Sequence, residues 1–169
     1  MNRIFRTTLL ASLVALLVSS CGIYSFSGTS IQPDVQTVTI NFFEYTATRV
    51  NPNLSNDLTE KLKSQFRKMT RLEQVDIDGD LEISGKVTGY DVQASSISAN
   101  EVAEKNKLTI TISVSFVNNK YPEDNFEKNF SQFSEYDSIN SLDAVESTLC
   151  AEIIDKLIED VFNATVANW

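Results

Sequence analysis

Residues 108–117, LTITISVSFV, have the clearest strand pattern in the chain. Apolar side chains alternate with hydroxyl side chains along this stretch: Leu108, Ile110, Ile112, Val114 and Phe116 share one phase, and Thr109, Thr111, Ser113 and Ser115 the other. Successive side chains of a strand point to opposite faces, so this alternation predicts a strand with one buried and one polar face. A sheet built around such a strand is covered on one side only.

Three other stretches are predicted to complete the sheet. VQTVTINFFEY (35–45) alternates as a strand, with Val38, Ile40 and Phe42 in the apolar phase. The strand that begins at Leu81 changes phase by one residue beside Gly89, which predicts a β-bulge. NFEKNFSQFSEY (125–136) fits a helical stripe as well as an irregular strand, and its aromatic content favours the strand. EVAEKNK (101–107) is read as a charged connection.

Two helices are predicted in addition to these strands. Asn51 is suited to cap a helix that begins at Pro52, and apolar residues follow at a spacing of four: Leu54, Leu58, Leu62 and Phe66, with Met69 continuing the stripe. The last helix begins at about Leu142, with Val145, Leu149, Ile153, Leu157 and Val161 inside. One-sided elements bury their apolar faces against each other. The expected fold is α+β, a two-layer sandwich of two helices on one face of a mainly antiparallel four-stranded sheet, in the order β-α-β-β-β-α.

The N-terminus has the pattern of a bacterial lipoprotein signal peptide. Arg3 and Arg6 precede an apolar stretch, residues 8–18, that is too short to span a bilayer. Val18-Ser19-Ser20-Cys21 resembles the lipobox, which implies acylation of Cys21 after removal of residues 1–20. The expected organisation is a signal peptide (1–20), an acylated tether (21–34) and one domain (35–169). Gly22 follows the cysteine in place of an inner-membrane aspartate, so we expect an anchor in the outer membrane facing the periplasm. An ordinary secretory peptide is the alternative.

Composition excludes several classes of function. Removal of residues 1–20 changes the formal charge from −9 to −11, which disfavours nucleic-acid binding. The chain has no histidine, so Ser-His-Asp catalysis and His-ligated zinc sites are excluded. No catalytic constellation, metal site or cofactor motif is expected. DIDGD (76–80) lacks the glycine and glutamate positions of a calcium-binding loop and is read as a turn. Cys150 falls in the apolar arc of the last helix and is read as a buried thiol.

Two surfaces are candidates for binding. The hydroxyl face formed by Thr109, Thr111, Ser113 and Ser115 suits either solvent or a polar partner surface. The first helix carries a basic side, and Lys61, Lys68 and Arg71 are the residues expected to contact anionic lipid if that side is more than a solvated face with ion pairs to Glu60.

The chain resembles the LptE family of LPS-assembly lipoproteins. The stretches that carry the resemblance are CGIYSFSG (21–28), GDLEISGKVTGYDV (79–92), NKLTITISVSFVN (106–118), FSQFSEYD (130–137) and VFNATVANW (161–169). The resemblance implies two helices on a four-stranded sheet, and a protein that plugs the LptD-like outer-membrane β-barrel, assists its assembly and passes lipopolysaccharide to the outer leaflet. A periplasm-facing scaffold of another outer-membrane complex is the main alternative, and a carboxylate-dependent hydrolase is disfavoured.

Overall fold

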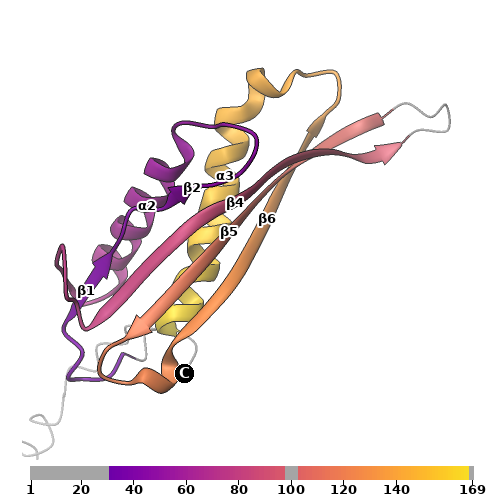
Figure 1. Cartoon of the computed structure of the whole chain (residues 1–169). Helices are drawn as coiled ribbons and strands as arrows, with labels where there is room; N and C mark the ends of the chain where they lie inside the picture. The colour runs from indigo at the N-terminus through magenta and orange to yellow at the C-terminus, as the bar shows by residue number, and fades with distance from the viewer. Residues whose placement is uncertain (1–30, 98–102, 168–169) are drawn as a thin grey trace, which may run out of the picture.

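A computed structural model of the chain describes residues 31–97 and 103–167. Its elements follow in the order β1 (Thr37–Ile40), β2 (Glu44–Tyr45), α2 (Leu54–Met69), β3 (Glu73–Gln74), β4 (Leu81–Ile97), β5 (Ala103–Asn118), the 3₁₀ turn η1 (Pro122–Asp124), β6 (Phe126–Asp137), α3 (Leu142–Phe162) and the π-helical turn η2 (Asn163–Ala167). Figure 1 shows α2 and α3 on the same side of the sheet. The predicted two-layer α+β architecture is confirmed.

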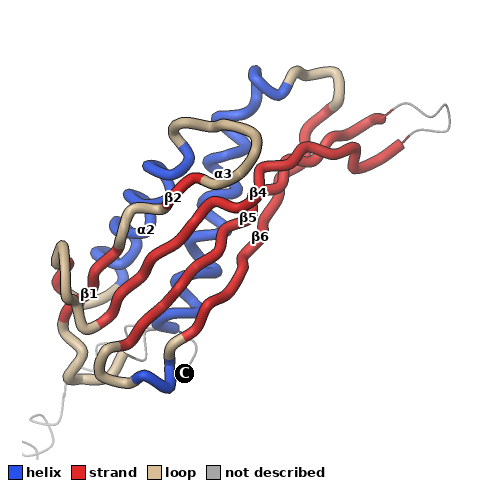
Figure 2. The backbone as a smooth tube through the Cα atoms, viewed as in Figure 1, coloured by secondary structure: helices blue, strands red, loops and turns tan. Residues whose placement is uncertain are grey.

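The sheet differs from the prediction in strand number and direction. It has six strands in the order β3-β1-β4-β5-β6, with β2 also paired to β4, where four mainly antiparallel strands were expected. β4, β5 and β6 form an antiparallel meander, whereas β1 and β2 run parallel to β4, and β3 runs parallel to β1. The chain passes through α2 between β1 and β3, and such a helical crossover returns a strand in the parallel direction. Figure 2 shows β2 as a brief red segment beside β4, and β3 forms the outer edge of the sheet next to β1.

The core lies between the sheet and the two helices. The predicted apolar phase of β5 is confirmed, because Leu108, Ile110, Ile112, Val114 and Phe116 are all buried. The spacing of four in α2 is confirmed for Leu54, Leu58, Leu62 and Phe66, and α3 buries Leu149, Ile153, Leu157 and Val161, with Val145 half-buried. The Phe66 and Phe162 rings meet edge to face with centroids 5.2 Å apart, which ties the helices to each other.

The first strand is interrupted where an unbroken strand over 35–45 was predicted. Ile40 pairs with Ile83 of β4, and Glu44 pairs with Lys86. Four steps along the first strand therefore match three steps along β4, so the first strand contains one extra residue. The extra residue changes the phase, so Phe43 is buried and Phe42 is 61% exposed, the reverse of the expectation for Phe42. The Phe43 ring lies over Gly85, where an added Cβ would stand 2.3 Å from its Cε1 atom.

The ends of α2 also differ from the prediction. The helix begins at Leu54 and not at Pro52, because Asn51 forms a local turn in which its Oδ1 atom accepts a hydrogen bond from the backbone N–H of Asn53 at 3.2 Å. Met69 is 51% exposed, so it does not extend the buried stripe. The helix ends there, since the backbone N–H of Thr70 donates to Phe66 at 3.0 Å and the next residues leave the helical path.

The central meander confirms two further expectations and corrects a third. Register shifts between Val87 and Gly89, which confirms the bulge. Residues 126–137 form a regular strand, β6, as the aromatic content favoured. The connection expected over 101–107 is wrong for residues 103–107, because β5 begins at Ala103 and pairs with both neighbouring strands from there. The far ends of β4 and β5 consequently project away from the helix layer (Figure 1).

Candidate functional site

The face of the sheet that α2 and α3 leave uncovered is the candidate docking site, and we call it the open face. Its residues are defined by register from alternate positions of β5. They are Lys105, Lys107, Thr109, Thr111, Ser113, Ser115 and Val117 of β5; Glu82, Ser84, Lys86, Gly89, Asp91 and Gln93 of β4; and Glu127, Asn129, Ser131, Phe133, Glu135 and Asp137 of β6. The structure thus brings all four predicted hydroxyl residues onto one surface.

Hydroxyl groups dominate the middle of the open face. Thr109, Thr111, Ser113 and Ser115 are half-buried by their neighbours, whereas the alternate residues of the same strand are fully buried. The Thr111 and Ser131 hydroxyls lie 3.0 Å apart across the β5–β6 pair, and the Thr88 hydroxyl donates to the Thr111 carbonyl at 3.3 Å. These contacts leave the hydroxyls with further capacity to donate or accept hydrogen bonds.

Charged pairs border this hydroxyl area. Lys86 contacts Glu44 at 3.3 Å on the β1 side, and Lys105 contacts Glu135 at 4.0 Å toward the projecting end. Exposed pairs of this kind contribute little to stability. The open face is therefore a polar surface whose hydroxyl and charged groups suit a partner wall that is itself polar.

Two candidate binding residues on the open face, Phe133 and Lys107, were not predicted from the sequence. Phe133 lies opposite Thr109 and is 48% exposed, although Phe126, Phe130, Phe133 and Tyr136 all looked like members of one apolar stripe. The Lys107 ammonium lies 5.1 Å from the centroid of the Phe133 ring. Phe130 and Phe133 are three residues apart, so in a strand their side chains point to opposite faces of the sheet. This distinction can be made once residues 126–137 are known to be extended.

The predicted basic residues do not belong to this face. α2 packs on the opposite side of the sheet, and the Lys61 ammonium is paired with Asp155 of α3. Lys63 pairs with Glu60 at 3.5 Å, which confirms the expected ion pair to that residue. Lys68 and Arg71 are exposed, and no acidic group among the described residues lies within 4 Å of either.

A groove of about 650 Å³ lies between the N-terminal halves of α2 and α3. Two residues that line it, Glu146 and Cys150, contact Tyr90: the Tyr90 hydroxyl donates to Glu146 and lies 3.6 Å from the Cys150 sulfur. Burial raises the pKa of the Tyr90 phenol, and its hydrogen bond to Glu146 raises it further. Burial also raises the pKa of the Cys150 thiol, which keeps it protonated and a poor nucleophile. The buried structural thiol predicted for Cys150 is confirmed.

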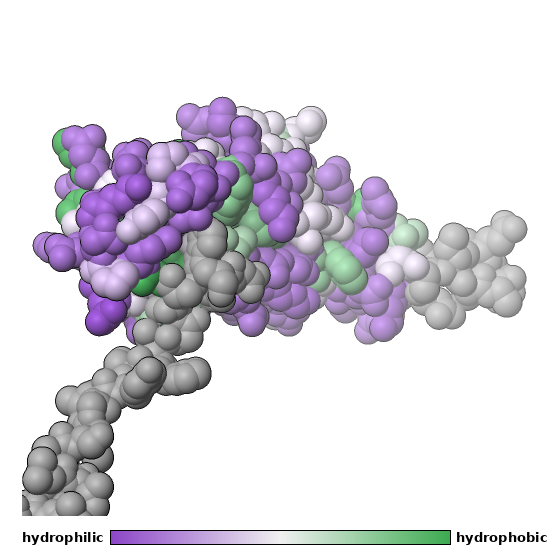
Figure 3. Space-filling model, turned by 90° about the horizontal axis from the view of Figure 1, so that it is seen from below, coloured by the Kyte–Doolittle hydropathy of each residue, from purple (hydrophilic) through white to green (hydrophobic). Residues whose placement is uncertain are grey.

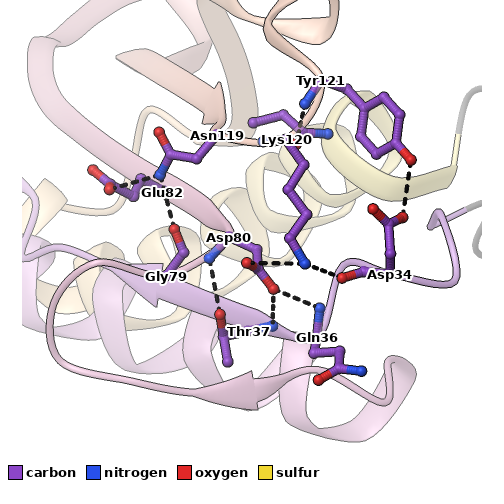
Figure 4. A network of polar contacts seen from close by, with 10 residues as sticks. Asp34, Gln36, Thr37, Gly79, Asp80, Glu82, Asn119, Lys120 and Tyr121 are labelled. Atoms are coloured by element: carbon purple, nitrogen blue, oxygen red, sulfur yellow. Dashed lines mark hydrogen bonds and ion pairs between the residues drawn. The ribbon is translucent and has the colours of Figure 1, made fainter.

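The turn over residues 76–80 has a structural role. The Asp80 carboxylate accepts hydrogen bonds from the backbone N–H groups of Gln36 at 2.7 Å and Thr37 at 3.1 Å, and it contacts the Lys120 ammonium at 3.2 Å. The first of these bonds is the main reason why the pKa of Asp80 lies below its ordinary value of 3.8. Figure 4 shows that this Asp80 network joins the segment leading into β1 (residues 34–37, the entry segment) to the loop before β4 and the loop after β5.

Tyr121 and Lys120 fasten the same entry segment from the other side. The Tyr121 hydroxyl donates to Asp34 at 2.9 Å, and the Lys120 ammonium donates to the Asp34 carbonyl. Gln32 adds a bond to Asp124 of η1 at 3.2 Å. The segment that leads from the predicted tether into β1 is therefore held at one end of the domain. Seen from below, this end is largely polar, with smaller apolar areas between the charged groups (Figure 3).

Cys21 and the predicted signal peptide lie outside the described residues. Across residues 31–97 and 103–167, no helix is long and apolar enough to cross a bilayer. Within these same ranges, no group of three or more metal-ligating side chains could hold a metal ion.

Comparisons with known proteins agree with this architecture. The chain shares its fold with the hypothetical protein CT253 from Chlamydia trachomatis, with a TM-score of 0.52, 5% identity, and coverage of 76% of this chain and 96% of that one. Rare lipoprotein B from Shewanella oneidensis gives a TM-score of 0.50 at 10% identity, covering 73% and 90% of the two chains. A sequence search of curated proteins gave no match.

The sequence itself matches one family over most of the domain. The profile of the LptE family, described as lipopolysaccharide-assembly, aligns with residues 35–165, which include every strand and α2 and α3. The chain therefore belongs to the LptE family of lipopolysaccharide-assembly proteins.

Proposed function

We propose that this chain is an outer-membrane lipoprotein that seats its open face against the lumen wall of an LptD-like β-barrel. In that position it assists assembly of the barrel and delivery of lipopolysaccharide to the outer leaflet. We assign it no catalysis and no cofactor. The observation that carries the proposal is the uncovered sheet face with its central hydroxyl area, in a chain of the LptE family.

The chemistry of the open face favours a polar partner. The lumen of a large outer-membrane barrel is polar, whereas its outer surface is apolar. Thr111, Ser113 and Ser115 can exchange hydrogen bonds with such a wall without burying an unpaired charge. An apolar partner would instead leave these hydroxyls unsatisfied when water is excluded.

Anchoring is proposed through Cys21. Two or three acyl chains hold a protein stably on a membrane, at about 0.8 kcal/mol for each buried CH₂ group. The segment that leads into β1 is fastened at Asp34, which is bonded to Tyr121, and at Gln36 and Thr37, which are bonded to Asp80. These bonds support a domain that is held at a defined end, so that the open face is presented in one orientation.

Direct contact with lipopolysaccharide through Lys61, Lys68 and Arg71 is a secondary proposal. Lys68 and Arg71 are the better candidates, since Lys61 is paired with Asp155. If they contact lipid phosphates, changing all three to Glu weakens lipopolysaccharide binding and reduces its salt dependence. Lys63→Glu, on the same helix, is the control for a general charge effect. Unchanged binding by the folded triple variant would assign this side of α2 to solvent.

Co-purification tests the main proposal. The tagged, acylated chain is solubilised from outer membranes in mild detergent, and its partners are identified by mass spectrometry. We expect an LptD-like barrel to be recovered in stoichiometric amount. A different assembly complex in its place would support the scaffold alternative, and recovery of the chain alone would contradict both. Cys21→Ser, compared with wild type for palmitate incorporation, tests the anchor separately, because the thiol is the acceptor of the acyl group.

A further inference from the structure

The open face has a single exposed aromatic anchor, and it lies toward one end of the hydroxyl area. Among the open-face residues defined above, only Phe133 and Val117 carry apolar side chains, and Val117 is half-buried at the opposite end. Phe133 exposes 48% of its surface among hydroxyl, amide and charged neighbours. An isolated exposed aromatic on an otherwise polar docking surface is the kind of residue that dominates binding energy.

Three contacts hold Phe133 in place. Thr109 is its direct partner across the β5–β6 pair, and the Lys107 ammonium lies 5.1 Å above its ring. From the helix layer, the Lys156 ammonium donates to the Phe133 carbonyl at 3.0 Å, which satisfies an outward-facing group of the edge strand. The strand pairing and the carbonyl bond fix the backbone of Phe133, and the Lys107 ammonium contacts its ring, so the ring is presented to a partner from a rigid strand.

Lys107 adds a charge to this anchor. No acidic group among the described residues lies within 4 Å of its ammonium, in contrast to Lys105 and Lys86, which have Glu135 and Glu44 as partners. Lys107 is half-buried as a residue, and its ammonium lies against the ring and retains donor capacity for an outside acceptor. An aromatic and a cation in contact present both an apolar surface and a positive charge to one partner site.

We propose that Phe133 and Lys107 are the binding hot spot of the open face, and that their partner site on the barrel wall is an apolar socket bordered by a carboxylate. This inference rests on the proposed function and names the chemistry of its contact. The hydroxyl area around Thr111 then contributes polar complementarity and excludes water, while most of the affinity comes from the Phe133 end.

Affinity measurements with four full-length acylated variants test the proposal. The detergent-solubilised barrel is titrated against each variant, and binding is followed at low and high salt. We expect Phe133→Ala to weaken binding at least tenfold. Lys107→Gln should weaken it about threefold at low salt and remove most of the salt dependence. Two controls at exposed apolar positions off the open face, Ile139→Ala and Ile77→Ala, should each stay within about twofold.

The outcomes separate this proposal from the one on which it rests. If the barrel binds wild type but Phe133→Ala binds equally well, the hot spot is wrong and the proposed function stands. If wild type does not bind the barrel at all, both fail. A photo-crosslinking residue placed at Phe133 gives an independent readout: capture of the barrel supports the hot spot, whereas capture of lipopolysaccharide alone would overturn it. Thermal unfolding of each variant confirms that the fold is retained.

Discussion

The two faces of β5 differ in what they contact, although they come from the same ten residues. Ile110, Ile112 and Val114 are fully buried under the helices, whereas the alternating Thr111 and Ser113 are half-exposed among other polar groups. The first set lies in the core that holds the fold together, and the second is free to face a partner. Stability and docking therefore depend on different faces of this domain, and a substitution can change one without changing the other.

The largest effect is expected on the core face. Ile112→Ala removes a fully buried side chain at the centre of the sheet and should lower the free energy of unfolding by about 2–5 kcal/mol. Ser113→Ala, the adjacent residue on the open face, should change it by no more than about 0.5 kcal/mol. Urea unfolding followed by circular dichroism measures both. Similar losses for the two variants would erase the distinction between the faces.

A second effect concerns the close contact between β4 and the interrupted first strand. Gly85→Ala places a Cβ 2.3 Å from the Phe43 Cε1 atom, so we expect a loss of about 1–3 kcal/mol from overpacking. Phe43→Leu removes the ring and should make the Gly85→Ala substitution less costly. The double-mutant cycle measures this coupling. Strictly additive losses would show that the two side chains do not compete for the same space.

A smaller and pH-dependent effect is expected at Asp80. Because its folded-state pKa lies below the unfolded value of 3.8, the carboxylate stabilises the fold above that value, and this contribution is lost as the pH falls through the folded pKa. Asp80→Asn should therefore cost about 1–2 kcal/mol at pH 7 and show a weaker loss of stability on acidification. Asp78→Asn, in the same turn, is the control. An identical acid dependence in wild type and Asp80→Asn would contradict this role.

The smallest effect on stability is expected on the open face itself. Thr111→Val keeps the side-chain shape and removes one hydroxyl contact, to Ser131, so the free energy of unfolding should change by no more than about 0.5 kcal/mol. The same variant should nevertheless weaken barrel binding, since a partner hydrogen bond is lost. A loss above about 1 kcal/mol in unfolding would mean that the open face contributes to the fold.

The assignment of β5 residues to the two faces could be predicted from the sequence, because apolar and hydroxyl side chains alternate with a period of two over ten residues. The spacing of four in α2 predicted Leu54, Leu58, Leu62 and Phe66 as core for the same reason. Periodicity failed where it was broken: the extra residue between Ile40 and Glu44 reversed the roles of Phe42 and Phe43. β3 has two residues, too few to show any period, and its parallel pairing depends on the path of the chain through α2.

The candidate site was predictable only in part. Thr109, Thr111, Ser113 and Ser115 follow from the alternation, but Phe133 could not be separated from Phe130 while a helix and a strand both fitted that stretch. The contact of Lys107 with Phe133 depends on the register of β5 against β6, which local sequence does not specify. Lys61 was predicted as a lipid contact. Its ion pair with Asp155 of α3 joins residues far apart in the sequence, so the local sequence does not reveal it.

In-cell photo-crosslinking along β5 is the most direct test of docking through the open face. A crosslinking residue is placed in turn at Thr111 and Ser113 on the open face, and at Asn119 in the loop that follows β5, and captured proteins are identified. We expect crosslinkers at Thr111 and Ser113 to capture the LptD-like barrel in cells that retain the folded, anchored chain. Capture from Asn119 alone, with none from Thr111 or Ser113, would contradict docking through the open face.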